Sequence, residues 1–435
     1  MKSQTNSPLN WTKNINIKTK IIYPSQVSQL KKIISNKEFI CAGNQRSYGD
    51  MAINKKLIVS MKNFNNIINF DEKKGTIEIE SGAILSDVLK DVIYKGWFFP
   101  VTPGTKYVSI GGMIANNIHG KKTSKNQIKY YINEIKIMMP NKKVIKCSSK
   151  KNKKIFNLTI GGFGLTGIIL SAKIKLKKIS SLYIDQKILK FDSYKQFFFH
   201  LNSINNFDYY VGWVQTFNSK KLKGLSYFGN HSKIKKFDNL IIKDKNLSFL
   251  KYFLLKVLTQ NIFFSKILNF FYKIFKSSFY KKTTNLYDYF YPQDKFIDWN
   301  KIYGKLGFTQ IQFLIKKNDL SNVLGDISIF FKKEKKFSPF VVMKKYNEKG
   351  DYLNFEGKGI SISMDVHIDN EFDKVKQFFN EIFIKYKAKV NLTKDFIADK
   401  KIFEKNYKYY KFKSDLNSIN KKNKFSSIFS KRLDL

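Results

Sequence analysis

Glycine is distributed unevenly along this chain, and this distribution constrains the fold more than any other feature. Three clusters lie within the first 170 residues, at positions 43–49, 104–112 and 161–167. Glycine allows a positive φ angle and close approach of the backbone, so such loops can present backbone N–H groups to a phosphate. None of the three has the GxGxxG pattern with a downstream acidic residue or the GxxxxGK[ST] pattern, so neither a Rossmann nor a P-loop site is predicted.

The apolar pattern around these loops predicts a mixture of helices and strands. Pro24 and Ser25 precede apolar residues at helical spacing, and a second helix is expected at 85–94, where Gly96 ends it. Strands are expected at 39–42, 57–61, 67–70, 76–80, 135–139 and 143–147, the last two as a hairpin. From about Ser180 to about Ala388 glycine becomes rare while aromatic residues and lysine dominate, which indicates a second domain.

The net charge of +47 has two interpretations. Only Arg46 and Arg432 among the 80 basic residues are arginine, and this excess of lysine is typical of proteins from AT-rich genomes. The alternative is attraction toward anionic partners such as phospholipid head groups or a phosphorylated substrate. The lysines are spread along the whole chain without a basic tail, so no nucleic-acid partner is predicted.

The length of 435 residues suits two domains, and Cys41 and Cys147 are expected to be small core residues in a reducing compartment. No apolar leader is evident in residues 1–11, so no signal peptide is predicted. The most apolar stretch, 247–275, is interrupted by lysines. It therefore contains no apolar run that is long enough to span a bilayer. It is expected to be either a buried domain-packing helix or an interfacial amphipathic helix. We therefore expect a cytoplasmic protein, with peripheral contact to the inner face of the plasma membrane as the alternative.

Several motifs, in this order and spacing, resemble the FAD domain of the vanillyl-alcohol oxidase superfamily. Within it, the chain is more similar to the flavoprotein halves of cell-wall sugar epimerases, and the resemblance spans nearly the whole chain. The motifs are Arg46-Ser47-Tyr48-Gly49-Asp50, Pro103-Gly104-Thr105, Gly111-Gly112-Met113-Ile114-Ala115, Ile118-His119-Gly120-Lys121, Gly164-Leu165-Thr166-Gly167-Ile168-Ile169, Thr393-Lys394-Asp395 and the terminal Arg432-Leu433.

The resemblance implies an α+β fold. It places a two-subdomain FAD-binding domain of the PCMH type at residues 1–180 and an antiparallel-sheet substrate (cap) domain at 181–389. Residues 390–435 would form a C-terminal segment that completes the FAD domain.

The resemblance also implies which residues bind the cofactor. Many relatives attach the flavin covalently to a histidine in the first glycine loop, where this chain has Arg46. A non-covalent FAD is therefore expected. Gln45 departs from a glycine that is usual in this loop. The expected cofactor-binding residues are Gly43, Asn44, Gln45, Arg46, Ser47, Tyr48, Gly49, Met51, Ala52, Pro103, Gly104, Thr105, Gly111, Gly112, Asn116, Ile118, His119, Ile168 and Lys394.

Oxidation of an alcohol by a flavin needs a proton acceptor and a positive charge near the flavin N1/C2=O edge. By position, Lys394 is expected to supply the charge, and His119 and Lys121 to be catalytic. The expected substrate-binding residues are Trp213, Phe296, Gln312, Lys344 and Ser361. The other three histidines, His200, His231 and His367, lack metal-ligand spacing, so no metal site is predicted.

The expected function is FAD-dependent oxidation of a secondary alcohol of a sugar, with a lipid-phosphate-linked pentose as substrate. A separate short-chain reductase would then complete an epimerisation. One alternative is an aldonolactone oxidase that acts on a soluble lactone with oxygen. Another is a non-enzymatic basic protein that binds membranes or nucleic acid, which only the charge favours.

Overall fold

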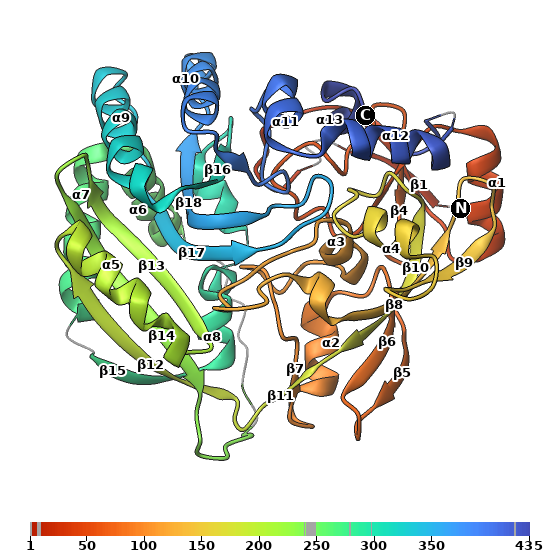
Figure 1. Cartoon of the computed structure of the whole chain (residues 1–435), viewed down its shortest axis with the longest axis horizontal. Helices are drawn as coiled ribbons and strands as arrows, with labels where there is room; N and C mark the ends of the chain where they lie inside the picture. Colours follow the sequence, from red (N-terminus) through yellow and green to blue (C-terminus); the bar gives the residue numbers. More distant parts are fainter. Residues whose placement is uncertain are drawn as a thin grey trace.

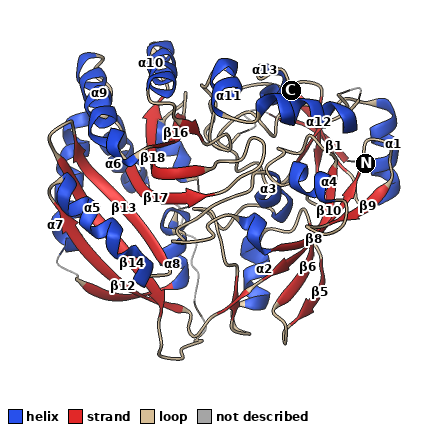
Figure 2. Cartoon of the chain, viewed as in Figure 1, coloured by secondary structure: helices blue, strands red, loops and turns tan. Residues whose placement is uncertain are grey.

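The structure is a computed structural model that describes residues 2–6, 10–238, 240, 249–277, 280–296, 298–421 and 423–435. Helices and antiparallel sheets are mixed throughout, which confirms the α+β class (Figure 2). In Figure 1 the first part of the chain, coloured red to yellow, forms one half of the molecule, and the green and cyan part forms the other.

Two small sheets and four α-helices make up most of the described residues between 2 and 178. One sheet has the order β1-β2-β4-β3, with parallel pairing of β4 to both β2 and β3. The other has the order β5-β6-β10-β8-β9 and is antiparallel. Their bounds are β1 Lys2–Asn6, β2 Thr19–Tyr23, β3 Ile40–Ala42, β4 Leu57–Ser60, β5 Ile67–Asp71, β6 Thr76–Glu80, β8 Ile132–Met138, β9 Val144–Cys147 and β10 Ile168–Lys175; a two-stranded pair joins β7 Trp97–Phe98 to β11 Lys177–Lys178.

The strands and the hairpin predicted here are confirmed to within three residues at each end. The helices are α1 Val27–Asn36, α2 Leu85–Val92, α3 Ile110–Ala115 and α4 Lys153–Thr159. The side chain of Ser109 caps α3 by accepting a hydrogen bond from the N–H of Gly112. Helix α3 ends at Asn116, and the following Asn117 has a φ of 41°. This turn directs the next residues, including His119, away from the helix.

The second half is built on one large antiparallel sheet with the order β15-β12-β14-β13-β17-β18-β16-β19. One face is covered by three helices whose apolar side chains share one core with the sheet, for example Phe197, Leu324 and Phe379 against Phe313. The strands are β12 Tyr183–Phe191, β13 Tyr209–Phe217, β14 Leu222–His231, β15 Lys281–Asn285, β16 Phe308–Ile315, β17 Val341–Glu348, β18 Gly357–His367 and β19 Lys389–Val390; the helices are α5 Tyr194–Asn202, α9 Leu320–Lys333 and α10 Phe372–Lys385.

The apolar stretch 247–275 differs from the single helix expected. Leu247 and Ser248 lie outside the described residues, and the rest forms two helices, α6 Phe249–Gln260 and α7 Ile262–Ser277. Asn261 separates them because its Oδ1 accepts hydrogen bonds from the N–H groups of Phe263 and Phe264, which caps α7. No helix among the described residues is long and apolar enough to cross a bilayer.

The C-terminal helices return to the N-terminal half, where they are drawn in blue beside the red segment (Figure 1). The N–H of Phe39 donates to the carbonyl of Lys424, and the N–H of Ser426 donates to the carbonyl of Phe39. The rings of Phe39 and Phe425 lie 5.1 Å apart. These helices are α11 Lys400–Asn406, α12 Tyr409–Ile419 and α13 Ile428–Arg432, and the short α8 spans Leu286–Phe290.

Candidate active site

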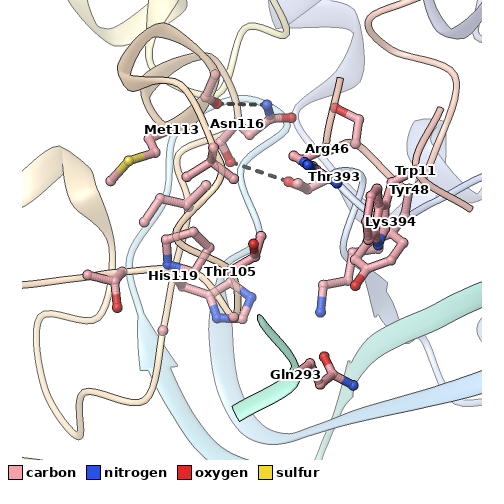
Figure 3. A pocket seen from close by; sticks show the side chains of 18 of the residues that line it. Trp11, Arg46, Tyr48, Thr105, Met113, Asn116, His119, Gln293, Thr393 and Lys394 are labelled. Carbon is pink, nitrogen blue, oxygen red and sulfur yellow. Dashed lines mark hydrogen bonds between the residues drawn. The ribbon is translucent and has the colours of Figure 1, made fainter. Parts of the chain in front are cut away.

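A cavity of about 620 Å³ lies between the two halves of the molecule. The three glycine clusters supply one wall, and the face of the large sheet opposite α5, α9 and α10 supplies the other. Figure 3 shows His119, Asn116 and Met113 on one side of this pocket and Trp11, Tyr48 and Lys394 on the other. Its volume falls within the range of 300–1,000 Å³ that is typical of small-molecule and cofactor sites.

The glycine wall depends on missing side chains. A Cβ atom on Gly43 would lie 1.8 Å from the Oγ of Ser109, so glycine is required for the loop to pack against the start of α3. A Cβ on Gly104 would meet nothing within 4 Å, so this backbone faces open space. Gly164 has a φ of 78°, and Gln45 adopts a left-handed φ of 49°. Gln45 therefore occupies a backbone conformation that favours glycine, the residue usual at this position in the resembling family.

Unpartnered polar atoms occur on both walls of the cavity. Among the described residues, buried side-chain atoms without a hydrogen-bond partner include Arg46 Nε, Ser81 Oγ, Asn116 Oδ1, Tyr289 Oη and Ser363 Oγ, all from residues that line the cavity. Buried polar groups in proteins normally have partners, because an unsatisfied group costs about 1–3 kcal/mol. The cavity is thus built for a polar ligand that supplies the missing partners.

Arg46 lies between aromatic rings. Its guanidinium carbon is 4.0 Å from the ring centroid of Trp11 and 5.4 Å from that of Tyr107. Burial lowers the pKa of Arg46, while the nearby Asp294 and Asp298 raise it. Because an arginine stays charged even with a lowered pKa, Arg46 presents a positive charge at the glycine loop.

The opposite wall is a polar stripe on three paired strands. Gln310 and Gln312 of β16 alternate with apolar neighbours, so they share one face. Gln310 pairs in register with Asp365 of β18, and Gln312 pairs with Ser363. Ser361, also on β18, pairs with Lys344 of β17. The strand register brings these six polar residues together although 55 positions separate Gln310 from Asp365.

Lys394 is connected to this stripe. Its Nζ donates to Oε1 of Gln310, whose Nε2 donates to Oδ1 of Asp365 at 2.6 Å. The hydroxyl of Tyr303 donates to the other Asp365 oxygen at 2.7 Å. Burial lowers the pKa of Lys394 to about 8, with Asp365 acting in the opposite direction. Burial also raises the pKa of Asp365 to about 6, against the hydrogen bonds from Gln310 and Tyr303. At neutral pH the pair is therefore a lysine cation opposite a carboxylate.

His119 is held neutral. Its Nε2 lies 3.3 Å from Nε2 of Gln312 and 3.2 Å from Nδ2 of Asn391, and both amides can donate to it. Its ring stacks on Phe355 with centroids 5.5 Å apart. Burial, followed by the charges of Lys344 and Lys394, lowers the pKa of His119 well below its usual value. The imidazole is consequently unprotonated at physiological pH.

Two further lysines line the same region. Lys121 donates to the carbonyl of Phe290 at 3.3 Å, and Lys344 donates to the carbonyl of Gly120 at 2.9 Å. Burial lowers the pKa of Lys121 to about 7. Burial and the charges of Lys394 and Lys121 lower the pKa of Lys344 to about 7. Both amines are thus close to half-protonated at neutral pH.

An ion-pair network fixes the segment that carries Lys394. Arg432 donates to both carboxylate oxygens of Asp50, at 3.0 and 3.2 Å, and to Asp395 at 2.9 Å. Asp50 and Asp395 are almost completely buried. Burial alone would lower the pKa of Arg432, but Asp395 and Asp50 together raise it. The network joins the end of the first glycine loop to the residue that follows Lys394.

Most residues expected at the site line the cavity. All three expected catalytic residues do, as do Trp213, Gln312, Lys344 and Ser361 and every expected cofactor residue except two. Those two are Gly49, whose Cβ would lie 2.1 Å from the carbonyl oxygen of Asp395, and Ile168, which packs with Met138 and Leu170 in a separate core. Phe296 packs beside Trp299 outside the lining. The structure does not bring these three to the cavity, and the roles of the others stay predictions.

Sequence reasoning missed several residues of the site: Trp11, Gln310 and Asn391 line the cavity, and Asp365 lies behind Gln310 without lining it. Asp365, Gln310 and Asn391 complete the networks of Lys394 and His119, and Trp11 stacks on Arg46. Polar residues stand at alternate positions in two strands: Gln310 and Gln312 in one, and Ser361, Ser363 and Asp365 in the other. This spacing could have indicated a polar surface, because alternate residues of a strand share a face. Trp11 gave no such signal. Among the described residues, no group of three His, Cys, Asp or Glu side chains could hold a metal ion.

The sequence of this chain is similar to one protein family and to several known proteins. Residues 19–148 match the family described as an FAD binding domain. The chain is 29% identical to decaprenylphosphoryl-beta-D-ribose oxidase of Mycolicibacterium smegmatis over 63% of each chain. It is 27% identical to D-lactate dehydrogenase of Anaerostipes hadrus over 35% of this chain and 34% of that protein. It is also 21% identical to D-arabinono-1,4-lactone oxidase of Debaryomyces hansenii over 42% of this chain and 36% of that protein. The chain thus matches less than two thirds of the length of each of these relatives.

These matches show an FAD-binding domain at residues 19–148, which agrees with the resemblance to the vanillyl-alcohol oxidase superfamily. The most extensive of the three similarities is to the decaprenylphosphoryl-beta-D-ribose oxidase. FAD is the cofactor, and the glycine wall, the charge of Arg46 and the unpartnered polar atoms fit a ligand that carries a pyrophosphate and a polar ring.

Proposed function

We propose that this protein is an FAD-dependent oxidoreductase that oxidises a secondary alcohol of a sugar. The observation that carries the proposal is that one cavity is lined both by the glycine loops of the FAD-binding domain and by the polar stripe of the large sheet. Bound FAD would supply the hydride acceptor of the reaction. The chain's own residues would then orient the sugar, hold the charge and take the hydroxyl proton.

Residues of the cavity can be assigned to each of these three roles. Lys394, a cation at neutral pH, would stabilise negative charge that develops in the transition state. Gln312 and Ser361, joined by a hydrogen bond of 2.9 Å, would orient the sugar hydroxyls. For the proton, His119, Lys121 and Lys344 are all wholly or partly unprotonated near pH 7, so any of the three is chemically suited to accept it.

We further propose a lipid-phosphate-linked pentose as the substrate. Support comes from the similarity to an oxidase named for decaprenylphosphoryl-ribose. Lys276, Lys282 and Lys295 also line one end of the cavity, where they suit a phosphate group. The keto-sugar produced would be a substrate for a reductase, and a short-chain reductase partner would complete an epimerisation. FAD would be bound non-covalently because Arg46 occupies the position of the linking histidine.

We also propose the domain organisation that the family resemblance implies. Residues 1–180 and 390–435 would together form a two-subdomain, PCMH-type FAD-binding domain, and residues 181–389 would form the substrate domain. The hydrogen bonds between Phe39 and the segment at 424–426 support the return of the C-terminus to the first domain.

The second candidate is an aldonolactone oxidase, favoured by the similarity to D-arabinono-1,4-lactone oxidase. Anaerobic bleaching of the flavin absorbance separates the two. Lipid-linked pentoses and soluble aldonolactones would be added to parallel samples. The proposal expects bleaching by the pentose at lower concentration than by any lactone. Faster bleaching by a lactone would favour the second candidate, and no bleaching by any sugar alcohol or lactone would contradict both.

A further inference from the structure

Helix α7 has its polarity reversed relative to a helix on the surface of a soluble protein. Lys273 faces the large sheet, is only 8% exposed, and pairs with Asp192 at 2.7 Å. Phe263, Phe270 and Phe271 point outward and are 65%, 53% and 62% exposed. A surface helix normally buries its apolar side and exposes its charged side. The outward aromatic face of α7 is therefore made for an apolar environment.

The exposed apolar side chains continue onto α6 and form one surface, which we call the α6–α7 apolar face. It consists of Phe253, Leu254, Ile262, Phe263, Phe264, Ile267, Leu268, Phe270, Phe271, Ile274 and Phe275, each at least 37% exposed. Clusters of this kind on a monomer mark contact sites for proteins or lipids.

The charged residues around this face favour a lipid surface over a protein as the partner. Residues 245–287 contain eight lysines and no aspartate or glutamate, although the whole chain has 33 acidic residues among 435. Bulky apolar side chains flanked by lysines, without acidic residues, match the boundary between acyl chains and anionic head groups. A surface that binds another protein more often carries charges of both signs.

The same helix forms part of the cavity wall. Tyr272 and Lys276 of α7 line the cavity. The Tyr272 ring lies 4.9 Å from that of Trp213, and its hydroxyl accepts a hydrogen bond from Tyr227 at 3.1 Å. One side of α7 thus faces solvent with phenylalanines while another side closes the cavity.

We propose that the α6–α7 apolar face inserts into the head-group and acyl-chain boundary of an anionic membrane, so that the cavity opens toward the lipid surface. Delivery of a lipid-linked substrate along α7 rests on the proposed function, whereas membrane binding itself does not. The test is therefore a binding measurement that requires no turnover.

The experiment is co-sedimentation of the FAD-loaded full chain with vesicles of phosphatidylcholine alone, or of phosphatidylcholine and phosphatidylglycerol at about 7:3. The test variant combines Phe263→Ser, Phe270→Ser and Phe271→Ser. The matched control combines Phe199→Ser, Ile329→Ser and Tyr410→Ser, which replace side chains on other helices that are at least as exposed as those of the test variant. FAD content and the circular dichroism spectrum of both variants establish that each is folded.

We expect the wild type and the control to bind the anionic vesicles, more weakly at high salt, and the test variant to bind at least about tenfold more weakly. Equal binding of the test variant would overturn the proposal, because general positive charge would then explain the attraction. A wild type that binds neither vesicle would overturn it as well. So would sedimentation-velocity data that show a wild-type dimer dissociated by the test substitutions, because a second copy would then cover the face. Bleaching by a soluble sugar alcohol without vesicle binding would refute this inference and leave the proposed oxidoreductase function intact.

Discussion

Substitution of Lys394 by methionine keeps much of the side-chain volume and removes the charge. Lys394 contacts Gln310 and, through it, the buried Asp365. With a pKa of about 8, Lys394 is protonated in about ten molecules for each unprotonated one at pH 7. Nearly the full effect of one preorganised charged contact is then available, which is typically about 10²–10³-fold in rate. We expect Lys394→Met to slow anaerobic reduction of the flavin by about 10²-fold or more.

The pH dependence of flavin reduction in the wild type follows from the same pKa of Lys394. Lys394 is charged below its pKa, and the charge is lost as pH rises through about 8. The rate of flavin reduction should therefore fall by about tenfold between pH 7 and pH 9. Lys344 and Lys121 titrate near pH 7 in the same cavity, so a second substitution is needed to assign the effect. Asp365→Asn removes the charge that raises the Lys394 pKa, and it should move the falling limb to lower pH.

Stopped-flow absorbance at several pH values is the assay, and Lys332→Met on the exposed end of α9 is the control. The midpoint potential of the bound flavin gives a second readout that needs no substrate. Loss of the cation should lower it by tens of millivolts, since about 30 mV corresponds to about 1.4 kcal/mol for two electrons. If Lys394→Met matches Lys332→Met in both rate and potential, Lys394 has no electrostatic role toward the flavin.

Three further substitutions test the cavity and its supports. Arg432→Ala leaves the buried carboxylates of Asp50 and Asp395 unpaired, so urea unfolding should show a loss of about 3–5 kcal/mol; a change below 1 kcal/mol would refute the support role of this network. Gln45→Gly relieves a left-handed φ of 49°, and the free energy of unfolding should rise by up to about 1 kcal/mol; a clear loss of stability would mean that the Gln45 side chain makes a compensating contact. Gly104→Val places its side chain in open space, so the apoprotein should unfold at the wild-type temperature while the FAD content after purification falls; full FAD occupancy would place the ligand away from Gly104.

Local patterns in the sequence predicted much of the first half of the fold. Strand β6 begins and ends where the alternation at 76–80 placed it, because alternate residues of a strand point to opposite faces and the apolar Ile77 and Ile79 share the buried one. Helix α3 ends after Ala115, since Asn116 caps it and Asn117 has a positive φ. The continuous apolar stretch at 247–275 gave no sign that Asn261 caps a second helix, because asparagine within a helical pattern can also face solvent.

Site residues that lie in contiguous sequence motifs could be predicted. Site residues that are brought together by strand register could not. The glycine loops, His119 and Lys394 were found from motifs. Asp365 and Asn391 were not, because their relation to Lys394 and His119 arises from pairing of strands that are distant in sequence. Ile168 was expected at the cavity and faces away from it, since a strand residue and its neighbour point to opposite faces. Gly49 was expected to meet the ligand, but its backbone packs against Asp395, a contact that only the returning C-terminus creates.

The most direct measurement is the amount and location of FAD in the purified protein. The chain would be denatured by heat or acid, and the flavin in the supernatant and in the precipitate would be quantified by chromatography. Gly104→Val, prepared in parallel, ties the result to this cavity. We expect about one FAD per wild-type chain, all of it in the supernatant, and much less from Gly104→Val. Flavin retained on the precipitated polypeptide would contradict non-covalent binding, and a colourless wild type that takes up no added FAD would refute a flavin-binding role for this cavity.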